Sequence, residues 1–318
     1  MYKWKKLGRI FNPKDYQTEW MKEFAQCTST LIFDNFVRIY FSCRPHKDSN
    51  NQAKSYTAFI DVDRKKLSKI INIAEKPVLP LGNLGSFDEF AVYPTSVIRN
   101  ASDVLLYYAG WYRTKSVPFN TSIGLAISKD DGKKFKRVGN GPILSPSLTE
   151  PFVISGPKIR KFNDRWYLFY LAGTQWIKDN NNPEIIYKIK MATSEDGINW
   201  IKYNKNIIED ILEPNECQAG PDVFYLDDKY HMYFVYRYAL DFRSNIKRGY
   251  RIGYATSNDL FNWSREDKNV GIKYSDKGWD SKMAHYPHIF ELDGNHYMLY
   301  NGNDFGKEGF GIAILNNE

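Results

Sequence analysis

A pattern of short strands recurs five times along the chain, and this repeat limits the possible folds more than any other feature. Each copy has a short apolar run, a charged or Asn/Gly turn and an aromatic-rich strand. Prolines at positions 94, 157, 221 and 287 mark four copies at spacings of 63, 64 and 66 residues, and Thr28 takes the same place in the first. Units of this kind cannot bury their faces alone. The repeat therefore predicts a ring of equivalent sheets.

Each copy continues into a third strand, a turn and a fourth strand. Third strands are predicted at 123–128, 189–194 and 252–257. Asp130 and Asp196 lie in the turns that follow, where an Asp side chain accepts hydrogen bonds from its own turn. We interpret these aspartates as structural and not catalytic.

The last copy needs a strand from elsewhere in the chain. Residues 310–315 supply its third strand, only three residues follow them, and residues 4–8 resemble the fourth strand at 135–139. An N-terminal strand in the last sheet would remove an exposed edge. Because 318 residues divided by five is about 64, we predict one all-β domain over 1–318, a five-bladed β-propeller. A TIM barrel would need eight helical segments that are not here.

Composition excludes several classes of function. The net charge is +7, but the lysines are scattered and no Lys/Arg stripe alternates with aromatic residues, so we expect no nucleic-acid partner. Three cysteines without a CxxC pair favour a reducing compartment. No signal-peptide core or long apolar stretch is present, which predicts a cytoplasmic protein without a membrane span. The five histidines lack metal-ligand spacing and no phosphate-loop motif occurs, so we expect neither metal nor cofactor.

Carboxylates recur in the lead-in loops, the segments that precede the first strand of each copy. They lie five to seven residues before the proline position, and the same offset predicts that they meet at the mouth of the central channel; they are Asp88, Glu89, Glu150, Glu216 and Asp280. Glycosidic bond chemistry needs one carboxyl group as acid and another as base or nucleophile. We expect Glu150 and Asp280 in these roles, with Asp88 orienting them. The alternative is that these groups cap strand ends or pair with nearby lysines.

Aromatic and planar polar residues beside the channel fit a sugar site. Tryptophans can stack on sugar rings, and the polar groups can bond to hydroxyls. The candidates for substrate binding are Trp20, Gln26, Arg44, Trp111, Arg113, Tyr236, Arg237, Trp279, His285 and Asn301. Packing between blades is the alternative role for a tryptophan, and His285 fits a structural role equally well.

Four strings of the sequence resemble a known superfamily. They are Ser86–Glu89, Thr149–Phe152, Gly278–Met283 and Leu299–Asn303. They are similar to an uncharacterised bacterial group within the five-bladed propeller glycosidases, which include arabinanases, xylosidases, levansucrases and invertases. The resemblance covers essentially the whole chain. It implies hydrolysis or transfer of glycosyl units, with a carbohydrate or nucleotide-linked sugar as partner.

The resemblance also locates the positions at which that superfamily has its three catalytic carboxylates. Here these positions hold Cys27, Tyr93 and Ser155. Either the lead-in carboxylates replace that triad or hydrolysis is lost. Propeller phosphorylases of the superfamily use a single acid with basic phosphate ligands, which Arg44, Arg113, Lys158 and Arg237 would allow. Three hypotheses follow: a glycoside hydrolase, a glycan phosphorylase or transferase, and a non-catalytic sugar-binding propeller.

Overall fold

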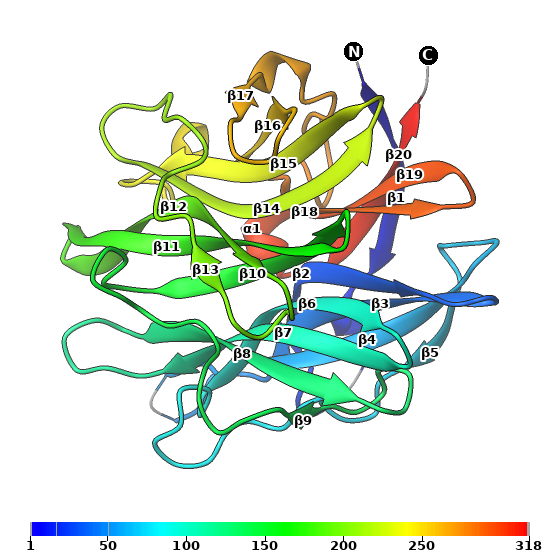
Figure 1. Cartoon of the computed structure of the whole chain (residues 1–318), viewed down its shortest axis with the longest axis horizontal. Helices are drawn as coiled ribbons and strands as arrows, with labels where there is room; N and C mark the ends of the chain where they lie inside the picture. The colour runs from blue at the N-terminus through cyan, green and yellow to red at the C-terminus, as the bar shows by residue number, and fades with distance from the viewer. Residues whose placement is uncertain (1, 17, 50, 317–318) are drawn as a thin grey trace.

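The protein, described by a computed structural model over residues 2–16, 18–49 and 51–316, forms five four-stranded antiparallel sheets (Figure 1). The first two sheets contain β2 (Glu23–Ile32), β3 (Phe36–Arg44), β4 (Tyr56–Asp63), β5 (Ile70–Ile73); and β6 (Ala91–Asn100), β7 (Asp103–Tyr112), β8 (Asn120–Ser128), β9 (Lys136–Arg137). The next two contain β10 (Ile154–Phe162), β11 (Arg165–Asp179), β12 (Asn182–Ser194), β13 (Ile201–Lys202); and β14 (Glu216–Leu226), β15 (Lys229–Tyr238), β16 (Arg251–Ser257), β17 (Ser264–Arg265). The last contains β18 (His285–Leu292), β19 (Asn295–Asn301), β20 (Phe310–Asn316) and β1 (Lys3–Phe11).

The five sheets are the blades of a closed ring. Their first strands, β2, β6, β10, β14 and β18, contact one another in that order, and β18 contacts β2 in turn. In Figure 1 these strands gather near the centre while the short fourth strands lie outside. Helical segments are short: α1 (Asn303–Gly306) is a single turn, and three 3-10 turns span Pro13–Asp15, Ile246–Arg248 and Asp267–Asn269. The predicted all-β, five-bladed propeller is confirmed.

The N-terminal strand closes the ring. β1 pairs antiparallel with β20, from Lys3 opposite Asn316 to Phe11 opposite Phe310, so the predicted closure is confirmed and extends beyond residue 8. Trp4 is 7% exposed, and its Nε1 donates to the hydroxyl of Tyr233 in the preceding blade at 2.8 Å. Strand pairing and a buried tryptophan therefore join the two ends of the chain.

The second strand of each blade is buried on both faces because it lies between neighbouring sheets. In β3, all residues between the first and the last are buried, whereas the outermost strands β9, β13 and β17 each have one exposed and one half-buried residue. This explains why the aromatic strands form nearly continuous apolar runs without polar alternation. Fully buried side chains such as Tyr40, Phe41 and Phe169 supply the large apolar area that stabilises the packed blades.

The turn aspartates have the structural role that the sequence predicts. The Oδ1 of Asp196 accepts the backbone N–H groups of Ile198 and Asn199, both at 2.8 Å, and Asp130 accepts that of Lys134 at 3.0 Å. The Asp130 turn also packs against the preceding blade, because the hydroxyl of Tyr40 donates to the Gly132 carbonyl at 2.8 Å. These turns therefore link blades and lie away from the central axis.

Candidate active site

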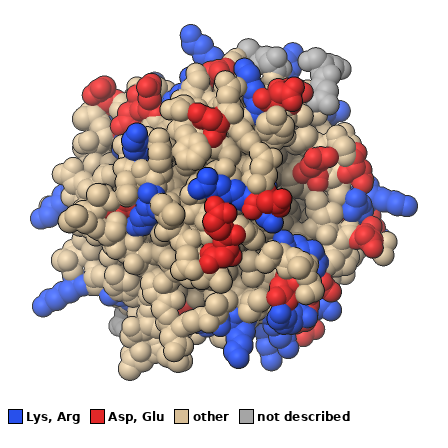
Figure 2. All heavy atoms as spheres, viewed as in Figure 1, with Lys and Arg blue, Asp and Glu red and all other residues tan. Residues whose placement is uncertain are grey.

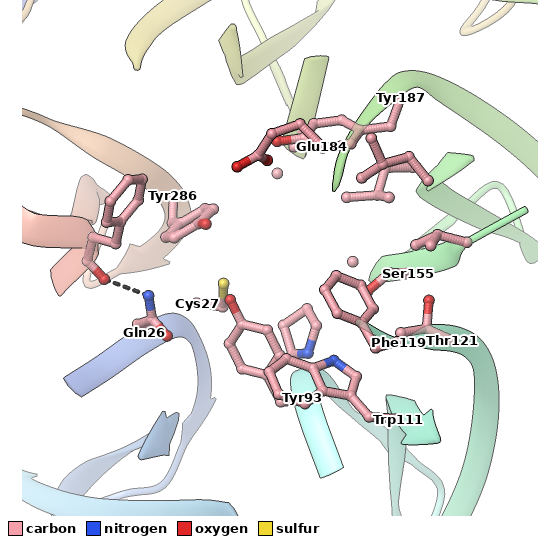
Figure 3. A pocket seen from close by; sticks show the side chains of 18 of the residues that line it. Gln26, Cys27, Tyr93, Trp111, Phe119, Thr121, Ser155, Glu184, Tyr187 and Tyr286 are labelled. Carbon is pink, nitrogen blue, oxygen red and sulfur yellow. Dashed lines mark hydrogen bonds between the residues drawn. The ribbon is translucent and has the colours of Figure 1, made fainter. Parts of the chain in front are cut away.

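Each inner strand has a bulge just before the repeat proline position, and this bulge builds the site. The pairing register shifts at the same point in all five blades: between Gln26 and Ser29, Val92 and Thr95, Ser155 and Lys158, Ala219 and Asp222, and His285 and His288. Bulges redirect a side chain from the sheet face. At this point Cys27 and Tyr286 have φ of 55° and 51°, a left-handed conformation that costs of order 1–3 kcal/mol for residues other than glycine. Figure 3 shows both directed into the central cavity.

The bulged residues form the floor of a cavity of about 400 Å³ at the end of the channel. Its walls are largely aromatic and come from all five blades; they include Phe24, Tyr93, Trp111, Phe119, Trp176, Tyr187, Phe242, Tyr250, Tyr286 and Phe305. The rings of Trp111 and Phe119 stack on each other with centroids 5.3 Å apart, and Trp176 meets Phe119 edge-on. Half-exposed rings of this kind offer faces on which a sugar can stack.

Three arginines and one carboxylate line this cavity: Arg44, Arg237, Arg243 and Glu184. Arg243 Nε donates to Glu184 Oε1 at 2.7 Å, and the side chains are 61% and 11% exposed. Within residues 2–16, 18–49 and 51–316, neither Arg44 nor Arg237 forms an ion pair with a carboxylate. The lining is therefore positively charged overall.

Glu184 reaches the cavity on an extended hairpin of the third blade. β11 has 15 residues, while the second strands of the other blades have 7 to 10. A register shift between Gly173 and Gln175 bends the hairpin, and Asp179 near its tip accepts the backbone N–H of Asp241 at 2.9 Å. The hairpin and the loop after β15 thus hold Glu184 at the cavity, and Figure 3 shows its carboxylate pointing inward.

A buried charge cluster lies deeper on the axis, at the position after the repeat proline in the third, fourth and fifth blades. Lys158 Nζ donates to the Thr28 carbonyl at 2.9 Å and lies 3.5 Å from Asp222 Oδ2, which is 2.7 Å from His288 Nδ1. Burial and the charge of Lys158 lower the pKa of His288 to about 3. Burial alone would raise the pKa of Asp222, but Arg160 and Lys158 outweigh it and keep this carboxyl ionised. The expected role of Lys158 as a phosphate ligand is not supported, because Lys158 is engaged in this cluster below the cavity.

The lead-in carboxylates do not meet at the cavity, and this corrects the sequence-based expectation. Asp88 contacts Arg137 at 2.6 Å, Glu150 contacts Lys202 at 2.7 Å, Glu216 contacts Arg265 at 2.6 Å and Asp280 contacts Lys6 at 2.6 Å. In each case the base comes from the fourth strand of the same blade. Three of them also accept a tyrosine hydroxyl from the second strand, at 2.9 to 3.1 Å: Tyr108, Tyr170 and Tyr300. These carboxylates join strands within single blades.

Glu89, the remaining lead-in carboxylate, is also engaged locally. Its Oε2 accepts the backbone N–H of Gly85 within its own loop at 2.9 Å, and Glu89 is absent from the cavity lining. All five proposed catalytic positions therefore lie outside the cavity. The alternative weighed from the sequence is pairing with Lys22, Lys158 or Lys282; four of the carboxylates do pair with a base, but that base is a different residue, from the fourth strand of the blade.

Of the ten expected substrate-binding residues, four line the cavity: Gln26, Arg44, Trp111 and Arg237. The other six have other environments. Trp20 donates to the Glu75 carbonyl at 3.2 Å, Arg113 packs on Phe90 and faces Asp48, and Tyr236 packs on Arg265. Trp279 stacks on Tyr300, His285 is fully buried between Tyr250 and Tyr286, and the Asn301 amide bonds to the carbonyls of Ala25 and Gly309.

The positions of the superfamily triad face the cavity without a carboxylate. Figure 3 shows Cys27, Tyr93 and Ser155 around the same space as Glu184. Burial raises the pKa of the Cys27 thiol to about 12, so it is a neutral group and no thiolate nucleophile. No group of three or more potential metal ligands occurs in the described part of the chain. Among the described residues that line the cavity, the single carboxylate is Glu184, which sequence reasoning missed.

The face of the molecule seen in Figure 2 has no large surface patch of a single charge sign. Acidic and basic side chains are interspersed there, with several acidic ones near its middle. No helix in the described residues is long and apolar enough to cross a membrane.

Known proteins resemble the chain at two levels. No protein-family model matches it. The uncharacterized protein Rv1502 of Mycobacterium tuberculosis is 33% identical over 315 residues, which covers 99% of each chain. The β-1,2-mannobiose phosphorylase of Thermoanaerobacter is 29% identical over 140 residues, 41% of this chain and 44% of that protein. A solved glycoside hydrolase superposes with a TM-score of 0.74 at 18% identity, over 98% of this chain and 90% of the other.

These likenesses agree with the architecture described above. The structural likeness at 18% identity concerns the fold alone, and it is that of a glycosidase-like five-bladed propeller. The sequence likeness over nearly the whole length is closer. The chain therefore belongs to the family of Rv1502, whose member described here is a five-bladed propeller with an aromatic, arginine-rich cavity at the centre.

Proposed function

We propose that the protein transfers a glycosyl unit at the central cavity and that Glu184 moves the proton. One observation supports this above all: of the described residues that line the aromatic cavity, Glu184 is the single carboxylate. The similarity to a phosphorylase over 41% of the chain and the glycosidase-like fold are consistent with a carbohydrate substrate.

A single carboxylate suits some glycosyl chemistry better than other kinds. Hydrolysis by the usual route needs two carboxyl groups on opposite sides of the bond, about 5 to 9.5 Å apart. Transfer from a sugar whose leaving group departs as a stable anion needs only one. Glu184 accepts the proton of the incoming hydroxyl as the new C1–O bond forms, and the leaving group takes the electron pair of the old bond. In the reverse direction Glu184 returns that proton.

The rest of the cavity supports binding and orientation. Trp111 and Phe119 form a stacked pair against which a sugar ring can lie, and the neutral Tyr93 and Tyr286 hydroxyls can bond to its oxygens. The Arg243 contact positions Glu184. Because Arg243 is largely exposed, it can move when a substrate enters.

Turnover of sugar 1-phosphates with a panel of acceptor sugars tests the proposal. General acid–base groups contribute about 10²–10⁴-fold, so Glu184→Gln should lower turnover by that factor while the fold and sugar binding persist. Glu195→Gln is the control, because Glu195 is 86% exposed on the same blade. Turnover of Glu184→Gln within about twofold of the parent would disprove the role of Glu184. If the parent and both variants bind sugar but none of them shows turnover, the result would favour a non-catalytic sugar-binding propeller.

A further inference from the structure

The cavity contains a buried cation without a counterion. Arg237 is 2% exposed, at the end of β15. Its hydrogen bonds go to neutral groups: Nε to the Tyr187 hydroxyl at 3.3 Å, and Nη1 to the carbonyls of Tyr238 and Ala239. No carboxylate forms an ion pair with it in the described ranges. Removing an ion from water costs several kcal/mol unless it is paired, so a charge in this state needs an explanation.

Aromatic rings account for part of the stability of Arg237. Its guanidinium carbon lies 3.5 Å from the centroid of Phe242 and 5.3–5.4 Å from those of Tyr187 and Tyr250. Each such contact contributes about 0.5–2 kcal/mol. These rings fix the position of the planar guanidinium group, but they carry no negative charge that could neutralise it. A planar cation fixed at a cavity wall is suited to a carboxylate or a phosphoryl group, which it can bind through two hydrogen bonds.

Arg44 repeats this arrangement in the first blade. Its guanidinium carbon lies 4.7 Å from the centroid of Phe24, 5.5 Å from Tyr93 and 5.3 Å from Trp111. The Nε atom is buried and has no hydrogen-bond partner. No ion pair with a carboxylate involves Arg44 within the part of the chain that the structure describes. Two separate blades thus direct an uncompensated guanidinium at the same cavity.

Other arginines show that this state is unusual in the protein. Arg38 is equally well buried but pairs with Asp61 at 2.7 Å, and Arg265, whose side chain is 5% exposed, pairs with Glu216 at 2.6 Å. Arg243, the third arginine of the cavity, pairs with Glu184 and also stacks on Phe242, with its guanidinium carbon 4.6 Å from the ring centroid. Arg237 and Arg243 therefore share one aromatic ring, which brings a third positive charge to the side of the cavity that holds Glu184.

We infer that Arg237 and Arg44 form a binding site for an anionic oxygen group, and that the ligand of the cavity is a phosphorylated sugar or a sugar together with phosphate. The inference rests on the proposed function for its sugar component and names the substrate class. The anionic group supplies the charge that the two guanidiniums lack. In the transfer step, Arg237 and Arg44 stabilise the departing phosphate, which explains how one carboxylate suffices.

Calorimetric titration at constant ionic strength tests the site, with inorganic phosphate, glucose 1-phosphate and glucose as probes. Inorganic phosphate and glucose 1-phosphate should bind to the parent protein and raise its melting temperature. Binding should weaken at least tenfold in Arg237→Gln and in Arg44→Gln. Arg251→Gln is the matched control, because Arg251 also stacks on tyrosines, forms no ion pair with any residue that the structure describes, and lies outside the cavity lining. Arg44→Gln decides the matter if Arg237→Gln does not fold.

Comparing the probes shows whether the anionic group is part of the sugar or is free phosphate. Comparing the variants distinguishes a failure of the anion site from a failure of the proposed function. Tighter binding of glucose 1-phosphate than of phosphate places the anion on the sugar, whereas equal binding indicates free phosphate; either result supports the site. Absence of binding for both anions, or equal binding by all three arginine variants, overturns it. Glu184→Gln should bind phosphate like the parent. Arginine-dependent phosphate binding without any glycosyl transfer would refute the proposed function and leave the anion site standing.

Discussion

Replacement of Glu150 by Ala should destabilise the fold without disabling the cavity. Glu150 is 1% exposed; it lies 2.7 Å from Lys202 Nζ, and Tyr170 donates to its oxygens at 3.0 and 3.1 Å. Removing one partner of a buried pair costs about 3–5 kcal/mol. Lys202 keeps its contacts with Ser145 and Ser147, which favours the lower end. With about 1 kcal/mol more for the Tyr170 hydroxyl, the loss should be about 3–4 kcal/mol.

The assay is urea unfolding followed by tryptophan fluorescence, with thermal unfolding alongside it. For a chain of 318 residues, a loss of this size should lower the melting temperature by roughly 4–6 °C. Glu195→Ala is the control on the same blade: it removes an exposed contact with Arg165 at 3.7 Å, which contributes less than about 1 kcal/mol. Turnover of folded Glu150→Ala should match the parent. A stability change below about 1 kcal/mol together with loss of turnover would refute the assignment of Glu150 as a structural residue.

Two further predictions concern pH and ring closure. Burial lowers the pKa of His285 to about 3, so below about pH 6.5 the unfolded chain binds a proton at this histidine that the folded protein does not bind. As the pH falls below that value, His285 should lower the free energy of unfolding by about 1.4 kcal/mol per pH unit. Urea unfolding at about pH 7 and about pH 5.5 should show a shallower pH dependence in His285→Phe, and an unchanged dependence would contradict this. Gly309 has φ of +97°, and an added Cβ would lie 1.7 Å from the Phe11 carbonyl oxygen; Gly309→Ala should therefore displace the end of β1 and cost at least about 2 kcal/mol. Gly139→Ala, with open space around the added Cβ, should change stability little, and equal melting temperatures for the two variants would contradict the closure argument.

The lead-in carboxylates illustrate a limit of reasoning from a repeat. Asp88, Glu150, Glu216 and Asp280 lie five to seven residues before the repeat position, and that regularity correctly indicates equivalent environments. Equivalent positions in a ring meet on the axis only if they face it. Here each carboxylate faces the fourth strand of its own blade, where a Lys or Arg some 50 residues away neutralises it. In the last blade the partner is Lys6, 274 residues away in sequence.

Glu184 shows the opposite case, a site residue that no repeat pattern marks. It lies on β12, opposite Ile177 in the extension that makes β11 longer than the second strands of the other blades. The extra length is visible in the sequence as a departure from the period, but its direction depends on the bend at Gly173 and on the contacts with Asp241 and Arg243. Insertions that break a repeat are where such a signal is best sought.

The order of residues alone determined the strands, the fivefold period, the turn aspartates and the closure by the N-terminus, because strand composition, turn chemistry and repeat spacing can be read directly along the chain. The tertiary structure decided which side chains share the cavity. That choice depends on the bulge before each proline position, on left-handed residues such as Cys27 and Tyr286, and on packing between blades. These features place residues hundreds of positions apart in contact, and their energies depend on burial and charge pairing that no short stretch of sequence contains.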